Sequence, residues 1–407
     1  MRIALFTDVF LPFVSGVVTE VVALAEALAD RGHHVFIIVP CYPRETRYAH
    51  PNVEIIKVSS FPAFFYEEFR FTSPLNPQTT KILNRQRPDI IHFHTPFTLG
   101  MQAILIAKFW QVPLVGTFHT FIADPQYLDH VQLNTPMGRR LSWEYSKLYY
   151  NRCDLITVPT KSAKAEMLKH GFTKPIKVLS NGLDLSGMDG GSDSRKKAAE
   201  IQKRYAENGP LLLFVGRVAY EKNLPYLFAC FRLVRQQVQH ARLLVVGGGP
   251  EMKQMRREAA KLGLGRSVIF VGSIPYKRLF ASGFYQASDL FVTASVTETQ
   301  GLTVIEAQAN GLPSVCVDAK GVKDVVSHGH NGFLVREGDQ QAFADAVLRV
   351  LRDEKLRARL GAEAVRDAAR FDIRRIAVSW ERTYALLLKR KAAERRRHRA
   401  SPFGTPR

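Results

Sequence analysis

The chain has 407 residues, enough for two cores of ordinary size, and its 46% hydrophobic and 23% charged residues are those of a globular protein. The net charge of +20 favours a partner with negative charge: nucleic acid, an anionic membrane surface or a phosphorylated small molecule. No apolar stretch approaches the roughly 18–20 residues that span a bilayer, and no signal peptide precedes the first strand. We therefore expect a cytoplasmic protein whose contact with a membrane, if any, is peripheral.

Short apolar segments alternate with helical patterns along the first half. The first strand is predicted in "RIALFTDVF", and the helix after it in "VVTEVVALAEALADRG", whose apolar residues repeat at helical spacing. Further strands are predicted in "HHVFIIVP", "VEIIKVS", "PDIIHFH", "VPLVGTFH", "DLITVPT" and "IKVLSNG", with helices between several of them. Repeated strand, crossover and strand indicate a mostly parallel sheet with helices on both faces.

The pattern stops at "GLDLSGMDGGSDSR", which has the composition of a linker, and then restarts with "PLLLFVGR", "ARLLVVGG", "SVIFVGS", "DLFVTAS", "LPSVCVD" and "NGFLVR". The sequence thus predicts an α/β protein of two doubly wound, Rossmann-like domains that face each other across a crevice. The predicted boundaries are residues 1–185 for the first domain, 186–195 for the linker and 196–371 for the second domain. A helix at about 372–391 is expected to pack back on the first domain, and the basic tail 392–407 is expected to be disordered.

Ligands of open parallel sheets bind beyond the carboxyl ends of the strands, so the loops after the strands carry the functional predictions. Arg217 and Lys222 follow one strand and could neutralise a diphosphate without a metal ion, or could be a solvated surface pair. The glycine cluster with Gly248 follows the next strand. It could admit a nucleotide close to the backbone, or could be a tight turn.

The stretch "SVTETQGLTVIEAQANGLP" follows another strand and contains two glutamates eight positions apart. A turn at Gly301 precedes a predicted helix, whose first backbone N–H groups could bind phosphate. Glu306 lies about one helical turn further on and could accept the two hydroxyls of a ribose, while Glu298 could accept hydroxyls of a second sugar. The alternative is that these glutamates serve the helix dipole or lie exposed to solvent.

The motifs "GRVAYEKN", "VVGGGP" and "TETQGLTVIEAQANGLP" together resemble those of the retaining glycosyltransferases of family 4, which have the GT-B fold. The resemblance extends to "DVFLPFVSGVVTEV" and "HFHTPFTLG…VPLVGTFHT" in the first half and covers roughly residues 1–385. It implies a metal-independent transferase that uses a nucleotide sugar and no other cofactor. The expected donor is UDP-glucose, with UDP-galactose and GDP-mannose left open.

The resemblance also implies roles for individual residues. Glu306 would bind the ribose and Glu298 the donor hexose. Arg217 and Lys222 would hold the diphosphate. The residues that would contact the donor through the backbone or lie beside its sugar are Gly16, Gly248, Gly301, Leu302, Thr303 and His119. Of these, Gly16 would bring an amide to the diphosphate from the first domain, and His119 would lie near the donor sugar and the acceptor.

Two further histidines flank Phe93. We expect His92 and His94 to point to opposite sides of a strand, which excludes a metal pair and leaves a structural or acceptor-lining role. No D-x-D motif occurs, which fits metal-independent transfer.

Acceptor specificity is expected in the first domain. Residues 59–74 form an aromatic, loop-like stretch, and residues 137–152 combine Trp143 and other apolar residues with Arg139 and Arg140. The second stretch is either an amphipathic helix for an anionic membrane surface or an ordinary half-buried helix. It resembles the branch of the family that glycosylates diacylglycerol and related lipids, so the expected acceptor is a membrane lipid. The alternatives are a soluble sugar or polysaccharide acceptor and, in another class, a nucleic-acid-binding protein, for which no motif is present.

Overall fold

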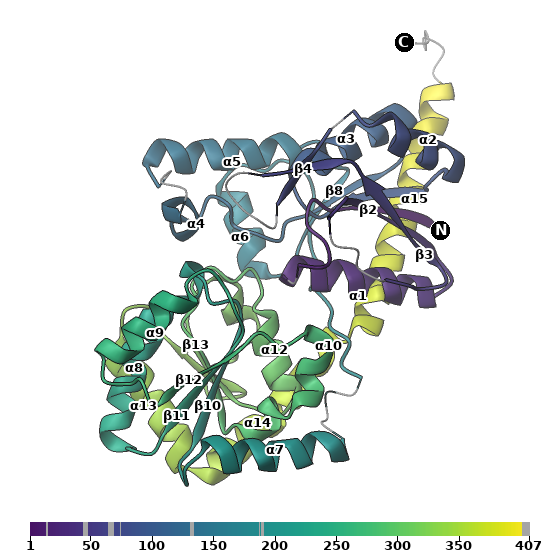
Figure 1. Ribbon diagram of the computed structural model, residues 1–407. Coiled ribbons are helices and arrows are strands. Elements are labelled where there is room, and N and C mark those ends of the chain that lie inside the picture. Colours follow the sequence, from purple (N-terminus) through teal and green to yellow (C-terminus); the bar gives the residue numbers. More distant parts are fainter. Residues whose placement is uncertain are drawn as a thin grey trace. The chain divides into compact units, whose positions relative to one another are not determined.

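The computed structural model describes residues 1–13, 15–43, 48–63, 69–73, 75–130, 134–186, 188 and 191–400. The chain divides into two compact units. We call residues 1–123, 135–182 and 373–407 the first unit, and residues 124–134 and 183–372 the second unit. Both units are Rossmann-like, as predicted, with a parallel sheet between layers of helices (Figure 1).

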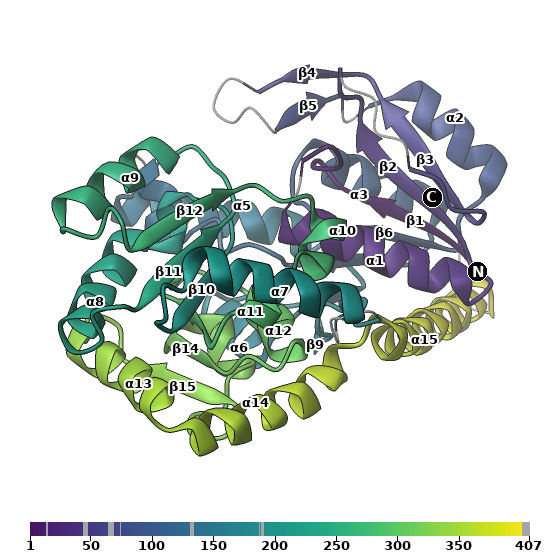
Figure 2. The same ribbon diagram turned by 60° about the horizontal axis from the view of Figure 1, so that its bottom comes forward.

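The sheet of the first unit has seven parallel strands in the order β3-β2-β1-β6-β7-β8-β9. The strands are β1 (Arg2–Phe6), β2 (His34–Pro40), β3 (Val53–Val58), β6 (Ile90–Phe93), β7 (Leu114–Thr117), β8 (Leu155–Val158) and β9 (Ile176–Val178). The helices are α1 (Gly16–Asp30), α2 (Pro77–Gln86), α3 (Thr98–Trp110), α5 (Pro136–Tyr150), α6 (Lys161–Lys169) and α15 (Ile373–Ala400). A separate antiparallel ribbon of β4 (Ser60–Pro62) and β5 (Arg70–Thr72) is visible in Figure 2.

Both faces of this sheet are buried, which explains why its strands are apolar runs rather than alternating patterns. Successive residues of β1 enter different cores, because side chains alternate across a strand. Ala4 and Phe6 pack with residues of α3 and α5, whereas Ile3 and Leu5 pack with α1 and α15. The fully buried Trp380 and Tyr384 of α15 belong to the second of these cores.

The sheet of the second unit has six parallel strands in the order β12-β11-β10-β13-β14-β15. The strands are β10 (Leu211–Val215), β11 (Arg242–Val246), β12 (Val268–Gly272), β13 (Leu290–Thr293), β14 (Ser314–Val317) and β15 (Gly332–Val335). The longer helices are α7 (Ser192–Tyr205), α8 (Leu224–Gln237), α9 (Met252–Lys261), α12 (Leu302–Ala309), α13 (Gln340–Arg352) and α14 (Glu354–Ala368). The shorter ones include α4 (Pro125–His130), η1 (Tyr220–Lys222), α10 (Tyr276–Leu279) and α11 (Phe284–Ala287).

The boundaries differ from the sequence expectation in three places. Residues 124–134 group with the second unit, because α4 contacts η1 there and Asp124 pairs with Lys320. Helix α7 begins inside the expected linker, where Asp193 lies in its first turn and pairs with Lys197. The polar residues that suggested a linker therefore stabilise a helix start, and part of the segment lies outside the described residues.

The basic tail was expected to be disordered from residue 392, but α15 continues to Ala400. Its alanine, glutamate and arginine residues have high helix propensity, and Arg390 pairs with Glu394 one turn later. Arg395 also donates to the backbone carbonyls of Trp110 and Gln111 at the end of α3. These interactions order the helix beyond the expected point, and residues 401–407 lie outside the described part.

Candidate functional site

The strand order places a topological switch point between β10 and β13, the position at which ligands bind in such sheets. The chain runs outward from β10 to β11 and β12 on one side, and then continues at β13 on the other. The loops after β10 and β13 are joined there by hydrogen bonds, since Ser295 Oγ donates to the carbonyl of Glu221 at 3.1 Å. The sheet therefore brings together the two loops that the sequence analysis selected.

Lys222 and Glu298 form an ion pair at this edge of the second unit. The Lys222 Nζ lies 2.5 Å from Glu298 Oε1, and the two side chains are 21% and 18% exposed. Burial alone would lower the pKa of Lys222, but the Glu298 carboxylate more than offsets it and raises that pKa. Burial likewise opposes ionisation of Glu298, and Lys222 nevertheless lowers its pKa. Both groups are therefore charged at neutral pH.

Arg217 is half-buried on the same loop as Lys222. Its positive charge acts on Lys222 and partly counters the effect of Glu298 on the lysine pKa. Arg217 and Lys222 thus place two cations at the carboxyl end of β10, beside the carboxylates of Glu298 and Glu221. Two clustered cations can bind an anion, and they are not a solvated surface pair because Lys222 is mostly buried.

The glycine turn after β11 is packed tightly against neighbouring backbone. A side chain at Gly247 would meet the Gly216 carbonyl at 1.9 Å, and one at Gly248 would meet Ser273 Oγ at 2.2 Å. The Gly248 carbonyl also accepts from the backbone N–H of Val218 at 2.8 Å. The neighbouring loops therefore require glycine here, so these residues by themselves do not indicate a nucleotide.

Gly301 lies before α12 with φ of 88°, a left-handed conformation that favours glycine. It has no side chain to cap the helix, and the first turn of α12 contains no acidic residue. The amides of Leu302 and Thr303 therefore begin the helix without a side-chain cap from Gly301. This end of α12 suits an anion.

Glu306 lies in the second turn of α12 and is only 3% exposed. The Tyr285 hydroxyl donates to its Oε2 at 2.8 Å, and the Tyr276 hydroxyl also bonds to the carboxyl. Burial raises the pKa of Glu306 to about 7, although both tyrosine hydrogen bonds oppose the shift. The two tyrosines orient the carboxylate. Glu306 is therefore not exposed to solvent, as one of the alternative interpretations required.

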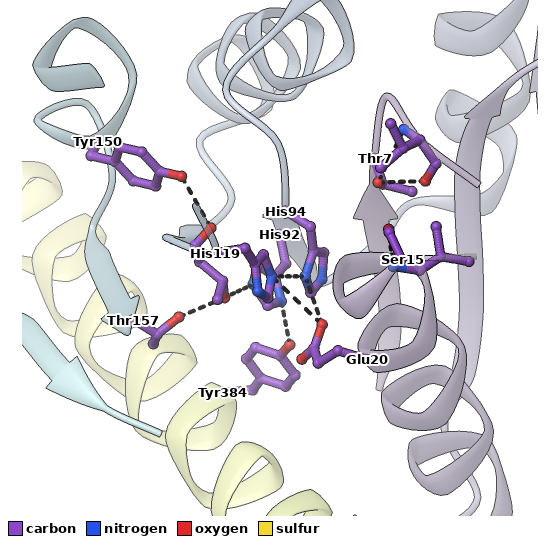
Figure 3. Close-up of polar contacts among 12 residues, drawn as sticks. Thr7, Ser15, Glu20, His92, His94, His119, Tyr150, Thr157 and Tyr384 are labelled. Carbon is purple, nitrogen blue, oxygen red and sulfur yellow. Dashed lines mark hydrogen bonds and ion pairs between the residues drawn. The ribbon is translucent and has the colours of Figure 1, made fainter. Parts of the chain in front are cut away.

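Gly16 and His119 belong to the first unit, so their predicted approach to the donor stays a prediction. Gly16 is the exposed first residue of α1, and Ser15 caps this helix by accepting from the Val18 backbone N–H. His119 follows β7 and lies against His94 and Glu20, with a His94 Nδ1 to His119 Nε2 distance of 2.9 Å (Figure 3).

The expectation that His92 and His94 point to opposite sides of their strand is wrong. Side chains repeat every two residues along a strand, so residues 92 and 94 share one side. Their ring centroids are 4.1 Å apart. His92 bonds instead to the Tyr384 hydroxyl through Nδ1 and to the Thr117 hydroxyl through Nε2, at 2.8 and 2.6 Å, which gives it a structural role.

A helix is present at the predicted place, as α5, but its exposed apolar face differs from the expected one. The Trp143 ring stacks on His170 at a centroid distance of 4.0 Å and also packs against Phe118 and Phe172. Trp143 therefore faces the protein interior. The exposed apolar residues are Met137, Leu141 and Leu148, with 63%, 60% and 41% of their surface accessible. Residues 64–68 of the aromatic stretch lie outside the described residues.

Sequence reasoning missed the residues that orient the predicted ones. Tyr276 and Tyr285 precede Glu306 by 30 and 21 positions, and Glu20 precedes His94 by 74. No local spacing joins such residues, because the topology of the sheet brings them together. Within the described residues, no helix is both long enough and apolar enough to cross a membrane.

Two family models match almost the whole chain. The model of the glycosyl transferases group 1 matches residues 196–367, and the model of Glycosyltransferase Family 4 matches residues 14–186. With the two Rossmann-like units, these matches establish that the chain belongs to the group 1 and family 4 glycosyltransferases of the GT-B fold.

Two relatives show how widely the family reaches. The alpha-monoglucosyldiacylglycerol synthase of Streptococcus pneumoniae is 28% identical over 353 residues, which cover 86% of this chain and 78% of the relative. The GDP-mannose-dependent alpha-mannosyltransferase of Corynebacterium glutamicum is also 28% identical, over 89% of this chain and 84% of the relative. The Anabaena protein HepE, solved with UDP and glucose, shares the fold with a TM-score of 0.75 at 20% identity, over 95% of this chain and 99% of that one.

Proposed function

We propose that this glycosyltransferase moves a hexose from UDP-glucose to a membrane lipid such as diacylglycerol, with retention of the anomeric configuration and without a metal ion. The observation that carries the proposal is the convergence of Lys222, Glu298 and Glu306 at the switch point of one sheet. Each of these side chains is mostly buried, and each matches one chemical part of a nucleotide sugar: phosphate, hexose and ribose.

The Lys222–Glu298 pair can serve both ends of the scissile bond. An ammonium group has three N–H donors, so Lys222 can keep Glu298 and still donate to a diphosphate oxygen. The second oxygen of Glu298 can accept a hexose hydroxyl. The ion pair would thus fix the distance between the group that holds the leaving diphosphate and the group that holds the sugar.

Bond breaking places positive charge on the sugar and negative charge on the diphosphate. Arg217, Lys222 and the amides at the start of α12 would stabilise the diphosphate, the kind of electrostatic effect that supplies several kcal/mol in enzymes. The leaving phosphate oxygen would take the proton of the acceptor hydroxyl on the same face of the sugar. This step needs no protein nucleophile.

The lipid acceptor is supported by the surface of α5 and by the name of the Streptococcus pneumoniae relative. Met137, Leu141 and Leu148 are spaced by four and seven positions, so they lie on one face of the helix. Arg140 is exposed beside them. Apolar residues with a basic flank on a surface helix suit the interface of an anionic membrane.

The relative named for GDP-mannose keeps a second donor open. The test is a panel of UDP-glucose, UDP-galactose and GDP-mannose, each incubated with a lipid extract or with soluble sugars. The proposal predicts a chloroform-soluble glycosylated product from UDP-glucose and the lipid extract. A product that forms only with a soluble sugar would reject the lipid acceptor, and a product that forms only with GDP-mannose would reject the donor.

A further inference from the structure

Three ionisable side chains from different elements meet inside the first unit. Glu20 lies on α1 one turn after Gly16, His94 follows β6, and His119 follows β7 (Figure 3). Their side chains are 2%, 0% and 4% exposed. The cluster lies near the switch point between β1 and β6, where a doubly wound sheet binds its ligands.

The distances between the side-chain atoms of the cluster show which of them are close enough to share a proton. His94 Nδ1 lies 3.1 Å from Glu20 Oε2 and 2.9 Å from His119 Nε2, whereas His119 Nε2 lies 3.6 Å from Glu20 Oε2. The rings of His94 and His119 stack at an interplanar angle of 16°. One nitrogen of His94 therefore faces both of its partners, and it lies closer to the carboxylate than His119 does.

Glu20 can only accept hydrogen bonds when it is ionised. Burial opposes ionisation, but the neighbouring His94 offsets burial and lowers the pKa of Glu20. Glu20 Oε2 has no aligned hydrogen bond among the described residues, so its 3.1 Å approach to His94 Nδ1 is an ion-pair contact. A lone pair on His94 Nδ1 would repel the carboxylate at this distance, so Nδ1 carries a proton and donates it to His119 Nε2 at 2.9 Å. The other nitrogen supports the same assignment: His94 Nε2 is buried without a hydrogen-bond partner among the described residues, and an unpaired acceptor is less costly there than an unpaired N–H.

The tautomer of His119 follows from this direction. Burial lowers the pKa of His119 to about 4, so its ring is neutral at physiological pH and has one N–H. A proton on His119 Nε2 would oppose the Nδ1–H of His94 across a separation of 2.9 Å. The ring therefore carries its proton on Nδ1.

We propose that Glu20 is a positioning residue which acts through His94 to hold His119 in the Nδ1–H tautomer. In this tautomer, His119 Nδ1 can donate a hydrogen bond to any substrate oxygen that approaches it. A sugar hydroxyl or a carbonyl can accept such a bond. The importance of this donor for sugar transfer rests on the proposed function, but the tautomer does not. Helix α1 carries both Glu20 and Gly16, the residue predicted to contact the diphosphate, and the two lie one turn apart on it.

The tautomer can be measured by nitrogen NMR on the full-length protein with ring-¹⁵N-labelled histidine. The His119 signals are assigned by their loss in His119→Asn. We expect the wild-type spectrum to show a protonated Nδ1 and an unprotonated Nε2 for His119. A wild-type His119 protonated at Nε2 would overturn the proposal, whatever the activity of any variant.

Glu20→Gln tests the role of the carboxylate, because an amide can donate to His94 Nδ1 and reverse the direction of the bonds. We expect His119 to lose the pure Nδ1–H pattern and kcat to fall about 10–100-fold, the size of effect seen for partners that orient metal-bound histidines. The donor KM should change less than about 3-fold, and Glu20→Asp should recover part of the activity. The matched control is Glu26→Gln on the same helix, which should keep wild-type kcat and the wild-type His119 spectrum.

The outcomes separate this proposal from the proposed function. If His119→Asn is inactive and Glu20→Gln is fully active, the positioning role fails and the transferase function stands. If His119→Asn is fully active, the predicted role of His119 in transfer fails.

Three ligand atoms this close could also hold a metal ion. The test is a Zn²⁺ titration of the wild-type protein and of Glu20→Gln, and we expect no one-to-one binding in either. One-to-one binding to the wild type that is lost in Glu20→Gln would make the cluster a metal site and would overturn the tautomer proposal.

Discussion

Lys222 and Glu298 are joined by an ion pair across 76 positions of sequence, with Nζ 2.5 Å from Oε1. The pair links the loop after β10 to the loop after β13, and the hydrogen bond from Ser295 to the Glu221 carbonyl holds the same two loops together. Removing one partner leaves a mostly buried charge without its counterion. The first prediction follows from this arrangement.

Lys222→Ala should lower kcat about 100–1000-fold, because the diphosphate would lose a preorganised cation that stabilises its developing charge. The measurement is steady-state turnover with UDP-glucose and lipid acceptor, with thermal unfolding recorded in parallel. The control is Lys253→Ala, an exposed lysine on α9, which should keep wild-type turnover. Wild-type kcat in Lys222→Ala would reject the diphosphate role.

Glu306→Ala should weaken donor binding by about 1–3 kcal/mol, because the ribose hydroxyls would lose their buried acceptor. Calorimetry with UDP measures this loss directly. Glu306→Gln keeps the size of the side chain and serves as the conservative comparison. Unchanged UDP affinity in Glu306→Ala would show that this carboxylate does not bind the nucleotide.

The affinity for UDP should also depend on pH. Burial raises the pKa of Glu306 to about 7, and only the ionised carboxylate can accept both ribose hydroxyls. Affinity should therefore increase as the pH rises through about 7, and Glu306→Gln should lose this dependence. The stability of the free protein should change in the opposite direction. The contribution of Glu306 is fully present below the unfolded pKa of about 4.5 and is lost as the pH rises through about 7.

Transfer should continue after exhaustive chelation, because Arg217 and Lys222 supply the positive charge that a divalent ion would otherwise provide. The measurement is turnover in excess EDTA against turnover with added Mg²⁺ or Mn²⁺. Activity that disappears in chelator and returns with either ion would contradict this prediction.

Leu141→Asp combined with Met137→Asp should release the protein from anionic liposomes, because the exposed apolar face of α5 would no longer enter the interface. Arg139→Glu with Arg140→Glu should have the same effect, as should raised salt, since each basic residue near such a surface contributes about 1 kcal/mol. Leu168→Asp, an exposed leucine on α6, is the matched control and should still bind. The assay should be repeated on a chain that ends at Lys389. Loss of binding only in that shorter chain would assign the contact to the tail.

Trp143→Ala should act on folding rather than on membrane binding, because this ring packs against His170 and Phe118. We expect a loss of about 3 kcal/mol in the free energy of unfolding, the lower end for removal of a packed tryptophan. Denaturant unfolding of this variant tests the loss of stability, and its liposome binding tests whether membrane binding is unchanged. Lost liposome binding with unchanged stability would place Trp143 at the membrane.

The sequence alone determined the class of fold and the family, and it supplied the residues that are proposed for the donor site. This was possible because buried parallel strands are continuous apolar runs and because site residues follow strand ends, so both signals are local. The tertiary structure decided the contacts between residues that lie far apart in the chain, which no local pattern contains. It joined Lys222 to Glu298, placed Tyr285 on Glu306 and Glu20 beside His94, and turned Trp143 inward. Those contacts depend on the strand order and on which helix face is buried, and residues far apart in the chain set both.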